Sequence, residues 1–335
     1  MHTDSSLLKW TRINLAMTLM VITLGALARL LDAGLGCPDW PGCYGQFIPP
    51  HSTESIQQAN ATHPLFPVEH IKAWSEMIHR YAASALGLSL LLLVGFIIGK
   101  EKYNNLKPVS FIALAWVVLQ GLFGMLTVTL RIWPPVVTLH LLAGMIMLTL
   151  TYTQYRLVSR QNLPRFEPKY LPDTIKVPLL SLIIITFIQM GLGGWTSSQY
   201  AGLACPDLPQ CQNQWWPETV NGPFHAPMVK AQEYLGGLLP MADRMAIQII
   251  HRFTACLLIL SALVLCARLF LLGKNNLIAL IITPIVIQVL IGIANVYLLL
   301  PLPLALLHNT GAAILWLCLW WAYFSLVENT SEIHQ

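Results

Sequence analysis

Eight long apolar stretches dominate this sequence and restrict it to a helical fold embedded in a membrane. A hydrocarbon core about 30 Å thick is crossed by about 20 apolar residues in an α-helix. Only 10% of the 335 residues are charged, against roughly 25% in a typical soluble domain. Basic residues form no continuous run, so we expect no nucleic-acid partner. The predicted spanning helices cover residues 11–31, 72–99, 107–130, 134–157, 176–197, 242–271, 277–300 and 303–326.

The distribution of Lys and Arg predicts the direction in which the helices cross. If the N-terminus lies in the cytoplasm, most of the 19 basic residues fall in inner segments, and the long loop 32–71 holds none of them. Basic residues accumulate on the cytoplasmic side of membrane proteins. We therefore expect a multi-pass protein of the plasma (inner) membrane, in contact with lipid, with both termini in the cytoplasm. The long loops 32–71 and 198–241 are then expected on the outer side.

The second half of the chain repeats the first. The loop motif Cys-Pro-Asp-Trp-Pro-Gly-Cys at residues 37–43 returns as Cys-Pro-Asp-Leu-Pro-Gln-Cys at 205–211, an offset of 168 residues. A His-Arg pair at residues 79–80 returns at 251–252, four residues later than that offset predicts, because the second outer loop is longer. Three positions within the spans recur at the offset of 168: Gln120, Gly124 and His140 return as Gln288, Gly292 and His308.

This repeat predicts the domain organisation. A fixed offset between matching motifs indicates a tandem duplication. Each half holds four of the predicted spans, an even number, so both copies cross the membrane in the same direction. We therefore expect an all-α protein of two tandem four-helix bundles, residues 1–160 and 161–335, related by a pseudo-twofold axis along the membrane normal.

Four of the ten histidines lie within predicted spans, two in each half. His79 lies about seven residues into its span and His140 about six into its own, so both rings are expected roughly 10 Å below the outer end. The same holds for His251 and His308. Two imidazoles facing each other across a four-helix bundle are the ligands that a six-coordinate haem iron needs. A single intramembrane histidine is as often a hydrogen-bonding or proton-path residue, but matched depth in both halves favours haem iron as the metal.

The two halves differ beside the first histidine of each pair. Glu76 precedes His79 by three residues, which puts both on one helix face. The matching residue in the second half is the neutral Gln248, and Arg29 is likewise matched by Ser197. A carboxylate buried in a membrane is costly and usually functional, although it can also be a hydrogen-bonded group near the interface. We therefore expect a chemical change in the first half and a permanent, electron-carrying haem in the second.

An arginine directly follows one histidine in each half, Arg80 after His79 and Arg252 after His251. Each arginine lies toward the outer end of its span, where a cation can pair with the anionic propionates of a haem. The alternative is that the long side chain extends to the interface and places its charge in water. The sequence favours neither interpretation.

Four of the seven cysteines form two short-spaced pairs in the outer loops, Cys37 with Cys43 and Cys205 with Cys211. Disulfides persist outside the cytoplasm. Each pair would close a small loop, stiffened by two prolines, and staple it as a cap over a haem site. A redox-active pair that exchanges electrons with a partner thiol is the main alternative, and a metal site is a third.

Together these motifs resemble the haem A synthases. The likeness rests on the first cysteine loop, the Glu-x-x-His-Arg motif that ends at Arg80, and the helices that carry His140 and His308. It extends from about residue 12 to 326. The resemblance implies an oxidoreductase acting on a CH group, which oxidises the C8 methyl group of haem O to a formyl group. The product, haem A, is destined for cytochrome c oxidase.

The resemblance also implies roles for individual residues. His79 and His140 would bind the substrate haem O in the first half, with Glu76 as the catalytic group. Haem b would be the cofactor of the second half, held between His251 and His308. The first cysteine pair matches the family's own pair, whereas members differ in the second pair, which is therefore not expected to be chemically essential.

The same resemblance implies partners. Haem O would be supplied by haem O synthase, a farnesyltransferase, and would enter sideways from the bilayer. The product would pass to cytochrome c oxidase assembly, and a homo-oligomer is one possible form of the protein.

Two other functions compete with this interpretation. A di-haem b electron carrier would keep four matched histidines, but it needs no carboxylate in one half alone. A membrane thiol/quinone oxidoreductase would use the outer cysteine pairs and leave the matched histidines unexplained. A transporter, suggested by the duplication alone, is weaker because the predicted helices are unbroken.

Overall fold

The computed structural model describes residues 5–160, 171–228 and 234–329, in which every named element is a helix. Within this described part, eight helices are long and apolar enough to cross a membrane. The prediction of an all-α fold with eight spans is therefore confirmed. The chain separates into two compact units: unit 1 is Met1–Asn162 with Ala226–Gly237, and unit 2 is Leu163–His225 with Leu238–Gln335.

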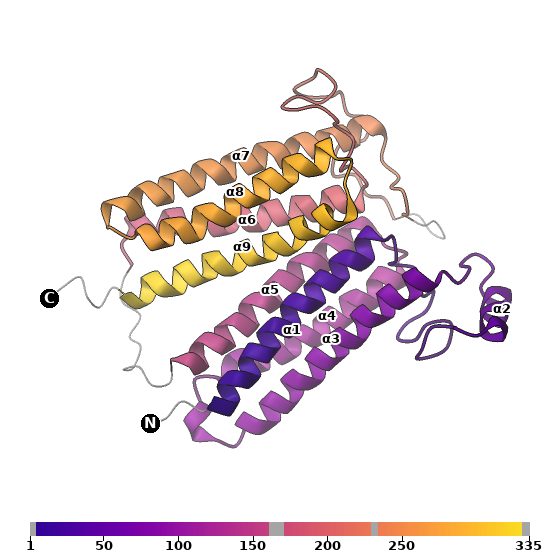
Figure 1. The fold of residues 1–335 in the computed structure, drawn as a ribbon, viewed down its shortest axis with the longest axis horizontal. Helices are drawn as coiled ribbons and strands as arrows, with labels where there is room; N and C mark the ends of the chain where they lie inside the picture. The colour runs from indigo at the N-terminus through magenta and orange to yellow at the C-terminus, as the bar shows by residue number, and fades with distance from the viewer. Residues whose placement is uncertain (1–4, 161–170, 229–233, 330–335) are drawn as a thin grey trace. The chain divides into compact units, whose positions relative to one another are not determined.

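Unit 1 contains four spanning helices and two short loop elements. They are α1 (Ser5–Leu30), α2 (Thr53–Thr62), α3 (His70–Ile97), the 3₁₀ turn η1 (Glu101–Tyr103), α4 (Lys107–Thr129) and α5 (Pro134–Ser159). The sequence analysis treats residues 32–71 as loop and does not predict α2. A capping box starts this helix, because the side chains of Ser52 and Ser55 accept each other's backbone amides. Figure 1 shows α2 in the loop, away from the spanning helices of its unit.

Unit 2 contains the other four spanning helices. They are α6 (Asp173–Ser198), α7 (Met241–Leu271), α8 (Asn275–Tyr297) and α9 (Leu302–Asn329). In both units the helices extend beyond several of the predicted apolar stretches, most clearly where α1 begins at Ser5. A helix continues through polar residues at the membrane interface, where the apolar pattern used to predict it has already ended.

The spanning helices of each unit pack in a closed cycle. In unit 1, both α1 and α4 contact α3 and α5. In unit 2, both α6 and α8 contact α7 and α9. The order of neighbours is therefore the same in the two units. Because α3 and α5 occupy opposite corners of their cycle, side chains from these helices can meet in the middle of unit 1, and those of α7 and α9 in the middle of unit 2.

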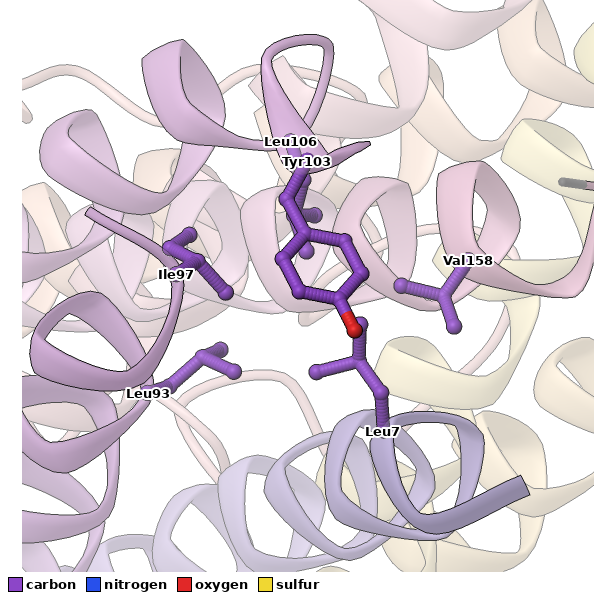
Figure 2. Packing of buried hydrophobic residues seen from close by; sticks show 6 residues of the cluster. All are labelled: Leu7, Leu93, Ile97, Tyr103, Leu106 and Val158. Carbon is purple, nitrogen blue, oxygen red and sulfur yellow. The ribbon is translucent and has the colours of Figure 1, made fainter. Parts of the chain in front are cut away.

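An apolar cluster closes the end of unit 1 at which α1 begins. Figure 2 shows the Tyr103 ring at the centre of this cluster, with its hydroxyl end directed toward Leu7. The cluster joins α1, α3, η1 and α5 through side chains that are all nearly inaccessible: Leu7, Leu93, Ile97, Tyr103, Leu106 and Val158. Between helices in lipid, such close van der Waals packing is a main source of association.

Shortening a side chain of this cluster is expected to destabilise the protein. Leu93→Ala leaves a cavity, because Leu93 is 0% exposed, and we expect the free energy of unfolding to fall by about 2–4 kcal/mol. Leu91→Ala is the matched control on the same helix, since Leu91 is 53% exposed. The measurement is thermal unfolding of each purified variant in detergent. Equal losses for the two variants would contradict the packing role of the cluster.

Candidate functional site

The two histidines of unit 1 meet in the middle of their helix cycle. The ring centroids of His79 on α3 and His140 on α5 lie 6.5 Å apart, with the rings at 89° to each other. Two imidazoles that bind one metal from opposite sides, at metal–nitrogen distances of about 2 Å, place their centroids about 6 Å apart. The spacing of these rings therefore fits two axial ligands of one iron.

The ring nitrogens of these histidines are available for a metal. The Nδ1 atoms of His79, His140 and His308 are buried and have no hydrogen-bond partner among the described residues. In a membrane interior no water compensates for such a missing partner, so a buried polar atom without one is costly. His251, the fourth histidine, lies on α7, which occupies the corner of its helix cycle opposite to α9 with His308. The donor chemistry of both pairs suits a haem iron.

Each of these histidines faces a glycine of a neighbouring helix. A Cβ added at Gly25 would lie 2.8 Å from Cε1 of His79, so a larger residue there would displace the ring. Gly292 lies tightly against His308, with an added Cβ at 3.3 Å from Cε1, whereas Gly193 and Gly124 make ordinary contacts with His251 and His140. The sequence analysis singled out Gly124 and Gly292 only as repeated positions. It missed Gly25 and Gly193, although their separation of 168 residues is the signal that would have found them.

Glutamine amides also contact the histidines. The side chain of Gln120 donates to the His140 carbonyl oxygen at 3.4 Å. In unit 2 the amide nitrogen of Gln189 lies 3.2 Å from both ring nitrogens of His251. The sequence analysis did not identify Gln189, because the residue at the matching position of the first half is Val21 and no repeated pattern draws attention to it.

Glu76 is buried at 5% exposure and faces the first cysteine loop. Its carboxylate accepts the backbone amide of Cys37 at 2.9 Å and forms an ion pair with Arg80. In unit 2 the matching Gln248 donates to the Gly202 carbonyl oxygen, so the hydrogen bond to the loop runs in the opposite direction. The carboxylate thus lies one helical turn before His79 in unit 1, and the same position of unit 2 carries a neutral amide.

Arg80 and Arg252 hold the cysteine loops onto their helices. Arg80 donates to the carbonyl oxygens of Asp39, Pro41 and Gly42. Arg252 likewise donates to the carbonyl oxygens of Cys205, Pro209 and Gln210. This third role is neither the propionate contact nor the interfacial charge expected from the sequence, because it depends on a loop distant in sequence. Arg29, which also differs between the halves, pairs with Asp32 at 2.8 Å.

The two cysteine loops, called cap loops here (residues 37–43 and 205–211), are built alike. Each is closed by a disulfide, and all four sulfur-bearing residues are fully buried. Asp39 and Asp207 each accept backbone amides from the residues five and six positions further on. The bond from the Gln212 amide is the main reason that the pKa of the Asp207 carboxyl lies below its usual value. An external thiol can therefore reach either disulfide only after its loop opens.

Comparisons with known proteins agree with these features. The family model COX15-CtaA, described as cytochrome oxidase assembly protein, matches residues 8–320. The chain is 39% identical to a haem A synthase of Shewanella oneidensis, over 92% of this chain and 93% of that protein. It is 28% identical to a haem A synthase of Bacillus licheniformis, over 87% and 86% of the two chains. A haem A synthase of Rickettsia rickettsii is 25% identical, over 96% and 98%.

Removing the anchor of the first cap loop is expected to expose its disulfide. Arg80→Ala should speed reduction of the Cys37–Cys43 bond by a small thiol about tenfold or more, since losing one hydrogen bond from a charged donor costs about 1.5 kcal/mol. Timed reduction followed by mass-tagging of the free thiols measures the rate. Lys72→Ala is the control, because Lys72 pairs with the exposed Glu69 near the surface. Identical reduction rates in the two variants would show that Arg80 does not hold the loop.

Proposed function

Since this chain belongs to the COX15-CtaA family and is a haem A synthase, an oxidoreductase that converts haem O to haem A, we propose that its two units hold different haems. Unit 1 binds the substrate haem O between His79 and His140. Unit 2 binds a resident haem b between His251 and His308. The observation that carries this division is the buried carboxylate of Glu76, which lies three residues before His79 and is matched by an amide in unit 2.

The residues of unit 1 would act on the substrate as follows. His79 and His140 bind the substrate iron and so fix the position of the ring that carries the reacting methyl group. Conversion of that C8 methyl group to a formyl group with one water releases four electrons and four protons. Glu76 takes up a proton or stabilises positive charge at the carbon being oxidised. Its pairing with Arg80 and the Cys37 amide keeps the carboxylate in place for that task.

The residues of unit 2 would hold the cofactor. A haem b bound there supplies one-electron transfer, which removes the electrons that the oxidation releases. His251 and His308 would be its ligands, and Gly193 and Gly292 lie against their rings. The neutral Gln248 adds no ionisable group beside this pair, which suits a haem that is not changed chemically.

The arrangement in the membrane follows from the charge distribution. We propose that the two units are copies of one four-helix bundle, with both termini in the cytoplasm and both cap loops on the outer side of the inner membrane. Water for the oxidation is then available near the outer ends of α3 and α5. The substrate comes from haem O synthase, and the product enters cytochrome c oxidase assembly. If Arg80 and Arg252 also bind haem propionates, each guanidinium would contact a propionate and the cap-loop carbonyls at the same time.

Neutralising the carboxylate tests the first assignment. Glu76→Gln is expected to lower the yield of haem A by at least about 100-fold, because it removes the proton acceptor or charge-stabilising group. Haem extraction followed by mass analysis measures the ratio of haem A to haem O. Glu69→Gln is the control, since it changes an exposed carboxylate at the start of the same helix. A normal yield from Glu76→Gln would show that Glu76 is not catalytic.

Removing a ligand tests the second assignment. His251→Ala is expected to abolish the low-spin b-type absorption spectrum of the purified protein, because one axial ligand is lost. The control is His225→Ala, which changes an exposed histidine of the same unit. A full low-spin b-type signal in His251→Ala would overturn the resident-haem assignment.

A further inference from the structure

The amide of Gln189 on α6 lies directly against the His251 imidazole. Its nitrogen is 3.2 Å from each ring nitrogen and donates to the His251 carbonyl oxygen at 3.1 Å. Its oxygen is buried and has no hydrogen-bond partner among the described residues. One helical turn further along α6, Gly193 lies against the ring, and a Cβ there would stand 3.5 Å from Cε1. The contact is thus built by two residues of one helix.

This side-chain contact belongs to unit 2 alone. The matching residue of unit 1 is Val21, and the register of the match is secure because the preceding Thr18 and Thr186 correspond. Both threonines are buried, and both hydroxyls donate to the carbonyl four residues earlier. Valine has an apolar side chain that cannot hydrogen-bond to the His79 ring, whereas the amide of a glutamine offers either an acceptor or a donor.

We propose that Gln189 is a positioning residue for His251, fixing the orientation and tautomer of this imidazole as a ligand of the resident haem. The inference rests on the proposed function, since it presupposes that His251 binds iron. It explains why the two units differ at this position. A resident cofactor benefits from a ligand held by a dedicated side chain, whereas a substrate has to be bound and released.

The chemistry of the contact follows from the proton on the ring. When one nitrogen of an imidazole binds a metal, the other carries a hydrogen and needs an acceptor. The amide of Gln189 supplies that acceptor by a half rotation, which turns its unpartnered oxygen toward the ring and gives up the hydrogen bond from its nitrogen to the His251 carbonyl oxygen. An acceptor at this place increases the electron donation of the ligand. It therefore favours ferric iron and lowers the reduction potential of the haem.

The test compares two substitutions at position 189 in the full-length protein carrying its haem. Gln189→Met keeps the length of the side chain and removes the acceptor, so we expect a reduction potential more positive than wild type and haem affinity weaker by about 10–100-fold. Gln189→Glu retains an acceptor oxygen and should return the potential to the wild-type value or below. Potentiometric titration of the b-type absorption band and the loss of haem to apomyoglobin are the readouts.

Thr186→Val is the control, because it removes another buried polar group from α6 that bonds within its own helix. Its potential and haem retention should match wild type. If Gln189→Met has the wild-type potential and retention while His251→Ala loses the haem, the positioning role is wrong and the haem assignment stands. If His251→Ala keeps its haem, the proposed function itself fails. Should Gln189→Met not accumulate, a potential for Gln189→Glu above the wild-type value overturns the positioning role.

Discussion

A histidine ring packed against a glycine of a neighbouring helix is the contact on which both units depend. Lipid supplies no hydrogen-bond partners, so polar ring nitrogens have to face the interior of a helix bundle. Glycine lets the adjacent helix come close enough to exclude lipid from that interior. The contact occurs twice in each unit, as His79 with Gly25, His140 with Gly124, His251 with Gly193 and His308 with Gly292. The closed cycle of helices in unit 1 then brings its two rings together across the centre.

The cap loops extend this arrangement to the outer ends of the helices. In unit 1 the residues that bind the loop, Glu76 and Arg80, lie on either side of His79 in the same helix. The loop, the carboxylate and His79 therefore form one connected structure, and a change in the loop reaches the histidine through a single helical turn. The buried disulfide strengthens this link, because it keeps the loop backbone in the position that both side chains require.

Two of the differences between the units lie beside the matching histidines His79 and His251. Unit 1 has the carboxylate of Glu76 where unit 2 has the amide of Gln248. Unit 1 has the apolar Val21 where unit 2 has the amide of Gln189. Each substitution changes which protons and hydrogen bonds the site can hold. A duplicated scaffold can thus keep one way of binding haem and assign chemistry to one copy and electron transfer to the other.

The sequence by itself determined the eight spans, the repeat and the four intramembrane histidines, because apolar length and a fixed offset are properties read along the chain. Only the tertiary structure decided what those residues touch. His79 and His140 come from opposite corners of a helix cycle, and Arg80 binds the carbonyls of a loop some 40 residues earlier. Both contacts depend on which helices pack together. Gln189 is a single unrepeated position, and its role emerges only when α6 lies against α7, because side-chain hydrogen bonds extend over a few ångströms in space and leave no periodic trace in sequence.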